Sequence, residues 1–198
     1  MTVHVIDDDD AMRDSLDFLL GVQGFDVRLY DSVAAFLDAL PTFDGGCILS
    51  DISMPGMSGL ELVRTLNERG LRHPVVLMTG HGDIAMAVEA MKAGASDFIE
   101  KPFSEETLLN AVRAALAQTG SSKGDDQAKQ EAGERLSSLS PRERDVLAGV
   151  VAGKANKVIA YDLGISPRTV EIYRANLMSK AGAKNLSELM RIALAAGL

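Results

Sequence analysis

Residues 3–10 read VHVIDDDD, a short apolar run that ends in four consecutive aspartates. Similar short apolar or β-branched runs recur at DVRLY (26–30), CILSD (47–51), PVVLMT (74–79) and DFIE (97–100). Amphipathic stretches follow them near residues 11–23, 32–40, 59–69, 83–93 and 104–118, with Ser32 and Ser104 as expected N-caps. Five strand-then-helix units predict an α/β fold whose five-stranded parallel sheet is covered on both faces.

Chemically active side chains stand at the ends of four of these runs. Asp7 to Asp10 follow the first, Asp51 ends the third, Thr79 ends the fourth and Lys101 follows the fifth. Parallel strands of such a sheet present their carboxyl ends at one edge, where ligands bind, so we expect these residues to lie together. Taken alone, the aspartate run also suits a solvated acidic turn, but the agreement of four strand ends favours a site.

The expected site combines carboxylates, a hydroxyl and an ammonium group. Clustered carboxylates repel one another unless a cation joins them, and oxygen ligands without a His or Cys cluster favour Mg²⁺. Aspartate is a competent nucleophile for forming an acyl phosphate, and a fixed lysine can neutralise a phosphoryl oxygen. The pattern therefore indicates phosphoryl transfer to an aspartate.

The last third of the chain follows a different pattern. Ser140 and Pro141 begin one expected helix, with Glu143 at the capping-box position, and Ser166 and Pro167 begin another. A short helix ending at Gly164 precedes the second of these starts, so the two helices around a tight turn predict a helix-turn-helix. Its second helix is the one expected to read the major groove, and SELMRIALAAGL (187–198) predicts a final amphipathic helix.

The boundary between the two patterns shows in composition and charge. Residues 119–135 contain no large apolar residue, so we expect a linker at 119–136 between domains at 1–118 and 137–198. Good helix formers in this linker leave open whether it is helical. Residues 1–118 hold 8 Lys or Arg against 19 Asp or Glu, whereas residues 137–198 hold 9 against 5. This asymmetry suggests that the C-terminal domain is the part that meets nucleic acid.

Composition also constrains the compartment. No run of about 18 apolar residues is present, so no membrane span is expected, and the acidic N-terminus does not resemble a signal peptide. The single Cys47 excludes an internal disulfide and suits a reducing compartment, and its apolar neighbours predict a buried core residue. A cytoplasmic location is therefore expected.

Several motifs carry a resemblance to a known family. VIDDDD, LSDISMPGMSG, VVLMTGHGD and DFIEKPF resemble a receiver domain, and LSPRERDVLAGVVAGKANKVIAYDLGISPRTVEIYRANLMSKAG resembles the LuxR-type effector domain of the NarL/FixJ response regulators, FixJ-type regulators in particular. The resemblance implies a flavodoxin-like (βα)5 receiver joined to a small all-α helix-turn-helix domain. It further implies a two-component regulator that a sensor histidine kinase phosphorylates, which then forms a homodimer, binds double-stranded promoter DNA and acts on transcription with RNA polymerase.

The same resemblance implies roles for individual residues. Asp51 corresponds to the phosphoacceptor, and Mg²⁺ is expected on Asp7, Asp8, Asp51 and the backbone carbonyl of Ser53. The four aspartates leave some ambiguity, with Asp9 a weaker candidate than Asp7 and Asp8. Thr79, Phe98 and Lys101 are implied to bind the phosphoryl group and to switch, and the Lys101–Pro102 bond is implied to be cis. A dimerisation face is implied at Val88, Met91, Lys92 and Ile99. The final helix of the chain is also implied to take part in dimerisation.

The expected reading helix supplies the candidate DNA contacts. Glu171, Ile172 and Ala175 are candidates for base edges, although Ile172 also suits the core. Candidates nearer phosphates are Arg168, Thr169, Arg174 and Lys180, and Lys157, which precedes this helix, is a further candidate DNA contact.

Two other functional classes use some of the same residues. A phosphatase would also use an aspartate nucleophile, Mg²⁺ and a lysine, but the helix-turn-helix argues against it. A constitutive DNA-binding or scaffold protein with a silent receiver would not need an intact Asp51, Thr79 and Lys101. We therefore predict a protein that is not an enzyme beyond catalysing its own phosphorylation and dephosphorylation.

Overall fold

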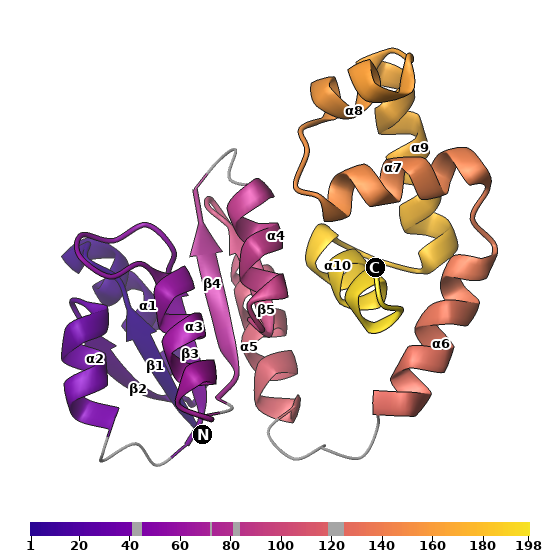
Figure 1. The fold of residues 1–198 in the computed structure, drawn as a ribbon. Coiled ribbons are helices and arrows are strands. Elements are labelled where there is room, and N and C mark those ends of the chain that lie inside the picture. The colour runs from indigo at the N-terminus through magenta and orange to yellow at the C-terminus, as the bar shows by residue number, and fades with distance from the viewer. Residues whose placement is uncertain (41–44, 72, 81–83, 119–124) are drawn as a thin grey trace. The chain divides into compact units, whose positions relative to one another are not determined.

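The computed structural model describes residues 1–40, 45–71, 73–80, 84–118 and 125–198 (Figure 1). The chain divides into two compact units, Met1–Asp83 with Ala93–Gly120 and Ile84–Lys92 with Ser121–Leu198. Of the expected linker, residues 119–124 lie outside the described residues, and α6 (Asp125–Ser137) covers all of the rest. Every helix in the described ranges is too short or too polar to cross a bilayer.

A five-stranded parallel sheet forms the centre of the first unit. Its strands are β1 (Thr2–Ile6), β2 (Asp26–Tyr30), β3 (Cys47–Asp51), β4 (Val75–Thr79) and β5 (Asp97–Glu100), in the order β2-β1-β3-β4-β5. Neighbouring strands end in register, as when Ile6 pairs with Ser50 and Asp51 pairs with Met78. The predicted α/β fold is confirmed, and the carboxyl ends of the strands meet at one edge.

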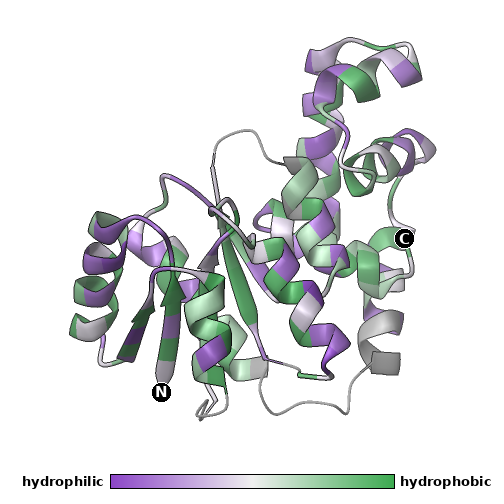
Figure 2. Ribbon diagram, turned by 60° about the vertical axis from the view of Figure 1, so that its left-hand side comes forward, coloured by the Kyte–Doolittle hydropathy of each residue, from purple (hydrophilic) through white to green (hydrophobic). Residues whose placement is uncertain are grey.

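Helices cover both faces of this sheet (Figure 1). Strand residues such as Val5, Leu49 and Met78 pack into one core cluster with residues of α1 (Asp10–Val22) and α5 (Glu105–Gln118). The opposite face carries α2 (Val33–Ala39) and α3 (Gly59–Glu68). In Figure 2 the middle strands are largely hydrophobic and the helices show both colours, as two-sided burial of the sheet requires.

Side-chain caps explain where several helices begin. The hydroxyl of Ser32 accepts a hydrogen bond from the N–H of Ala35, and that of Ser104 accepts one from Thr107. Both predicted caps are therefore confirmed. At α3 a reciprocal capping box joins Ser58 and Glu61, which fixes the start of the helix that follows the loop after Asp51.

Cys47 lies in the middle of this unit's core. It opens β3, has no exposed surface, and burial raises the pKa of its thiol to about 12. The predicted role as a small buried core residue is confirmed, because an inaccessible and protonated thiol is unreactive.

The second unit contains a helical domain of α6, α7 (Pro141–Val151), α8 (Asn156–Leu163), α9 (Pro167–Ala181) and α10 (Leu186–Ala195). The predicted capping box of Ser140 and Glu143 is present, and Ser166 caps α9. Gly164 ends α8 with φ 66°, a left-handed conformation that glycine adopts without strain. The predicted helix-turn-helix is therefore confirmed as α8, this turn and α9. The remaining helix, α4 (Ile84–Lys92), follows β4 in the chain.

Candidate functional site

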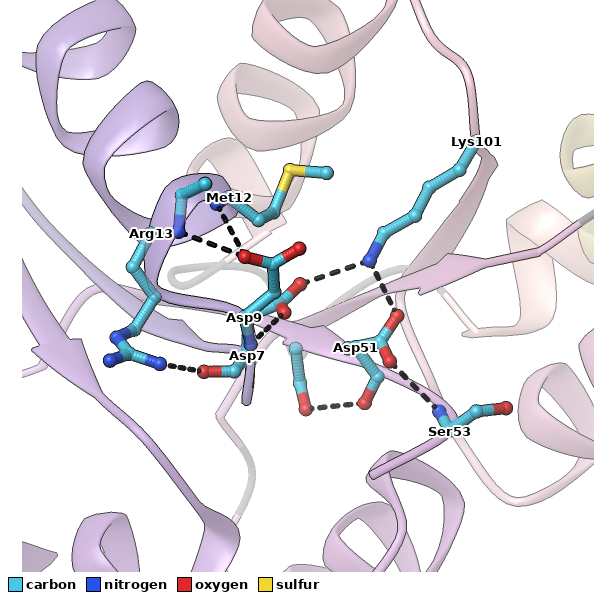
Figure 3. A network of polar contacts seen from close by, with 9 residues as sticks. Asp7, Asp9, Met12, Arg13, Asp51, Ser53 and Lys101 are labelled. Atoms are coloured by element: carbon cyan, nitrogen blue, oxygen red, sulfur yellow. Dashed lines mark hydrogen bonds and ion pairs between the residues drawn. The ribbon is translucent and has the colours of Figure 1, made fainter. Parts of the chain in front are cut away.

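Asp7, Asp51 and Lys101 meet at the carboxyl edge of the sheet. The Lys101 Nζ lies 2.9 Å from Asp7 Oδ2 and 2.8 Å from Asp51 Oδ1, so one ammonium group bridges two carboxylates (Figure 3). Asp7 is 1% exposed and Asp51 is 8% exposed, at the ends of neighbouring strands. The Lys101–Pro102 peptide bond is cis, as expected.

Burial and charge act in opposite directions on these groups. Burial raises the pKa of the Asp51 carboxyl above its ordinary value, although Lys101 and the Ser53 N–H, which donates to Asp51 Oδ2 at 3.2 Å, act to lower it. Burial alone would lower the pKa of Lys101, but its hydrogen bonds to Asp51 and Asp7 outweigh this and raise it. The lysine therefore remains an ammonium group beside the nucleophile candidate.

The four consecutive aspartates have four different environments. Asp7 is buried against Lys101, whereas the Asp9 carboxylate caps α1 by accepting from the N–H of Ala11 at 2.9 Å. Asp10 pairs with the side chain of Arg13. Asp8 is exposed and makes no side-chain hydrogen bond or ion pair that the structure places among residues 1–40, 45–71, 73–80, 84–118 and 125–198. The structure thus separates Asp9, which caps α1, from the buried Asp7 beside Lys101 and from the exposed Asp8.

The donor chemistry of this edge fits Mg²⁺. Asp7 and Asp51 share one ammonium group, and the exposed Asp8 follows Asp7 directly in the chain, so acidic oxygens outnumber positive charges at this edge. Within the described residues no cluster of three or more carboxylate, imidazole or thiol side chains is preassembled as a metal cage. Mg²⁺ does not need one, because it keeps several waters and is usually held by one or two carboxylates.

The two predicted switch residues lie on the adjoining strands. Thr79 ends β4 and is 3% exposed, with its hydroxyl donating to the Gly80 carbonyl at 3.4 Å. The Thr79 carbonyl accepts from the N–H of Lys101 at 2.7 Å, which couples the two strand ends. Phe98 is half-buried on β5, where it pairs with Leu77.

The residues expected on a dimer face are mostly not exposed. Val88 and Met91 are buried on α4, and Lys92 is exposed at the end of that helix. Ile99 belongs to the core cluster with α1 and α5, because alternate residues of β5 point to opposite faces of the sheet. The structure therefore places Ile99 in the core and not on a surface.

The second candidate site is the outward face of α9. Val170, Leu177 and Ala181 are buried and face the core of the helical domain. The opposite face exposes Arg168, Glu171, Ile172 and Ala175. Ile172 is 55% exposed, so the alternative that it belongs to the core is wrong.

The polar residues expected near phosphates differ in their partners. Arg174 donates to Asn156 Oδ1 at 2.7 Å, and burial lowers the pKa of its guanidinium. Lys180 donates to Glu143 Oε2 at 2.8 Å, and Thr169 shares a 2.8 Å hydroxyl contact with Ser166. Arg168 and Lys157 are exposed.

Sequence reasoning missed several residues that the structure brings into these sites. Arg13 and the cap role of Asp9 have a local signal, since Asp9 immediately precedes the first helix and Arg13 lies one turn later. On α8, Val158 and Tyr161 are 46% and 87% exposed beside the reading helix. Their three-residue spacing places them on one face of α8.

Comparisons with known proteins agree with this architecture. The family described as "Response regulator receiver domain" matches residues 3–113, and that described as "Bacterial regulatory proteins, luxR family" matches residues 137–193. The chain is 56% identical over 198 residues to the transcriptional regulatory protein FixJ of Azorhizobium caulinodans, covering 100% of this chain and 94% of that protein. It is 50% identical over 196 residues to FixJ of Bradyrhizobium diazoefficiens, covering 99% and 96%.

Solved structures give the same result. Full-length FixJ from B. japonicum aligns with a TM-score of 0.60 at 50% identity, covering 99% of this chain and 97% of that one. The FixJ-N crystal structure aligns with a TM-score of 0.58 at 45% identity, covering 61% and 96%. With both domains matched and identity above 50% along the whole length, this chain belongs to the response regulators that join a receiver to a luxR-family DNA-binding domain, among the FixJ-like transcriptional regulators.

Proposed function

We propose that a sensor histidine kinase phosphorylates Asp51 and that this modification switches on DNA binding. The observation that carries the proposal is the position of Asp51, whose carboxylate is held between the Lys101 ammonium and the Ser53 N–H. Asp7, Asp8, Asp51 and the Ser53 carbonyl would hold Mg²⁺. Bound there, the cation would offset the negative charge of the incoming phosphoryl group.

In the proposed reaction an Asp51 carboxylate oxygen forms a bond to phosphorus while the bond from phosphorus to the donor's leaving atom breaks. Lys101 neutralises one phosphoryl oxygen, and the buried Asp7 keeps that ammonium in place. The Thr79 hydroxyl turns from the Gly80 carbonyl to the phosphoryl group, and Phe98 moves inward behind it. This self-modification and its hydrolytic reversal are the only covalent chemistry that we assign to the chain.

The proposed output is a homodimer on promoter DNA in the cytoplasm. Phosphorylation would expose Val88 and Met91, which are buried in this structure, and two receivers would pair through the face that these residues form with Lys92. Two α9 helices then enter the major groove at two half-sites about one helical turn apart. The exposed residues of α9, with Lys157 on α8, supply base and phosphate contacts, and the bound dimer acts on RNA polymerase.

Intact mass after incubation with acetyl phosphate and Mg²⁺ tests the proposal. Wild type should gain one phosphoryl group, and chelation of Mg²⁺ should prevent the gain. Asp51→Asn should gain none, whereas Asp38→Asn, an exposed aspartate on α2, should behave as wild type. Full labelling of Asp51→Asn would exclude Asp51 as the acceptor.

A further inference from the structure

Arg13 reaches back from the first turn of α1 to the end of β1. Its Nη1 donates to the Asp7 carbonyl oxygen at 2.6 Å, and its Nη2 pairs with Asp10 (Figure 3 shows the first contact). The side chain is only 14% exposed. An arginine that is so well covered, with two anchors in one loop, holds a defined geometry.

The contact fixes the backbone between the two proposed metal ligands. Asp7 is already held at its N–H, which donates to the Tyr30 carbonyl at 3.2 Å, and at its carboxylate, which accepts from the Asp9 N–H at 3.0 Å. Arg13 holds the remaining group, the carbonyl. Because the peptide unit is planar, holding the Asp7 carbonyl also sets the orientation of the Asp8 N–H and the direction in which Asp8 leaves the strand.

We propose that Arg13 is a positioning residue, which orients Asp7 and Asp8 for a divalent cation by holding the carbonyl between them. The inference rests on the proposed function, since it concerns the same Mg²⁺ site. Asp8 is exposed, and its side chain makes no hydrogen bond or ion pair within the described parts of the chain, so the main chain sets the direction in which this side chain leaves the backbone. Outer contacts of this kind commonly change metal affinity by about 10- to 100-fold.

The direction in which Mg²⁺ affinity changes when Arg13 is replaced distinguishes a positioning role from a purely electrostatic one. Arg13 is a cation beside four aspartates, so its removal makes the site more negative. Through charge alone, Arg13→Gln would bind Mg²⁺ more tightly than wild type. Loss of positioning predicts the opposite.

Calorimetric Mg²⁺ titration of the full-length protein, followed in parallel by amide NMR shifts of residues 7–9, tests the proposal. Arg13→Gln should bind Mg²⁺ about tenfold more weakly. Arg13→Lys keeps the charge but cannot reproduce both planar contacts, so its affinity should fall between the two. Arg69→Gln is the matched control, because Arg69 is exposed at the far end of α3 from Asp51, and it should bind as wild type.

Labelling by acetyl phosphate supplies the second readout. The Arg13→Gln rate should be low at limiting Mg²⁺ and recover to near wild type at saturating Mg²⁺, which an unfolded variant would not show. Mg²⁺ binding by Arg13→Gln that equals or exceeds that of wild type overturns the proposal. If Arg13→Gln does not fold, an Arg13→Lys variant with the wild-type affinity for Mg²⁺ overturns it. If wild type itself takes no phosphoryl group, the proposed function fails instead.

Discussion

The single ammonium group of Lys101 pairs with two carboxylates, those of Asp7 and Asp51. The net charge at this edge of the sheet therefore depends on Lys101. Without Lys101, Asp7 and Asp51 would face each other with no cation between them. Like charges in a partly buried site hold a divalent cation more tightly, although the same change removes a phosphoryl ligand. Removing Lys101 should therefore raise the affinity for Mg²⁺ and weaken the response to phosphorylation.

Lys101→Ala should bind Mg²⁺ about three- to tenfold more tightly, since one positive charge a few ångströms away is lost at a partly screened site. Its phosphorylated form should no longer dimerise. Mg²⁺ titration and light scattering measure the two effects, with Lys92→Ala as the exposed lysine control for metal affinity. Weaker Mg²⁺ binding by Lys101→Ala would contradict this account of the site charge.

Gly59 illustrates how tightly α3 approaches β3, the strand that ends in Asp51. A Cβ added there would lie 2.4 Å from the Asp51 carbonyl oxygen and 2.9 Å from Leu77 Cδ2. Gly59→Ala should therefore destabilise the receiver by about 1–3 kcal/mol, because backbone cannot move aside cheaply. In denaturant titration, Gly21→Ala in α1 serves as control, since its Cβ would meet nothing within 4 Å. Equal stability of both variants would show that α3 shifts freely.

At the scale of elements, an ion pair joins the start of α7 to the last turns of α9. Glu143 is 3% exposed, accepts from Lys180 at 2.8 Å, and also accepts from the Ser140 N–H at 2.7 Å. The hydrogen bond from Lys180, followed by that from Ser140, lowers the pKa of Glu143 to about 2. The capping box and the packing of the reading helix thus depend on one carboxylate.

This depressed pKa predicts the pH dependence of the helical domain. A carboxyl whose pKa falls on folding stabilises the fold fully above its unfolded pKa, which is near 4.5, and loses that contribution as pH falls towards 2. Glu143→Gln should thus be less stable than wild type above pH 4.5, and the difference should shrink between pH 4.5 and 2. Denaturant unfolding followed by methyl NMR of Val146 and Leu177 measures it. A difference independent of pH would argue against the ion pair.

Ile172 predicts one feature of the DNA site. An aliphatic side chain that is exposed on a reading helix can recognise only an apolar feature of a base edge, and in the major groove that is the thymine methyl. In a half-site selected from a random library, replacing one thymine by deoxyuracil should weaken wild-type binding about three- to fivefold, the contribution of one buried methyl. Ile172→Ala should lose this sensitivity at the same position. If both proteins respond alike to every replacement, Ile172 does not contact a thymine methyl.

Features encoded by neighbouring residues could be predicted from the sequence. The strands, the caps at Ser32, Ser140 and Ser166, and the turn at Gly164 depend on short-range periodicity and on residues that satisfy local backbone groups. The convergence of Asp7, Asp51 and Lys101 followed from the parallel topology, because it requires only that the strand ends share an edge.

Features that depend on distant partners could not be predicted in the same way. Asn156 and Arg174 are 18 residues apart, and Glu143 and Lys180 are 37 apart, so no local pattern indicates that these pairs form. The sequence did not decide whether the linker is helical, because α6 contains good helix formers but few apolar residues that pack against other helices. Ala132 and Leu136 are the main buried ones. The burial of Val88, Met91 and Ile99 was not predicted, because the resemblance named a face of the domain and not the direction of each side chain.

At the scale of the whole molecule, charge is divided between the domains. The receiver is strongly acidic and the C-terminal domain is basic. The C-terminal domain has only four more Lys or Arg than Asp or Glu, so one copy can neutralise few DNA phosphates. A single domain should therefore bind DNA weakly. If receivers pair as proposed, the second of two joined domains should meet its half-site at an effective concentration near the millimolar range.

Phosphorylated wild type should accordingly bind a two-half-site DNA at least about 100-fold more tightly than DNA with one half-site. Asp51→Asn, treated identically, should show little of this gain. Light scattering with and without a phosphoryl mimic should show a shift from monomer to dimer, and anisotropy titrations on the two DNAs measure the affinities. A phosphorylated protein that stays monomeric and still gains affinity would exclude dimerisation as the switch.

The buried thiol of Cys47 has a practical consequence for following this switch. Since the chain's single cysteine has no exposed surface and a pKa of about 12, thiol reagents at neutral pH should leave it unmodified. Cysteines introduced at the exposed Ser15 and Ser179 would then be the only reactive ones. Spin labels at these two positions, one in each unit, would report the interspin distance before and after phosphorylation while the natural core remains intact.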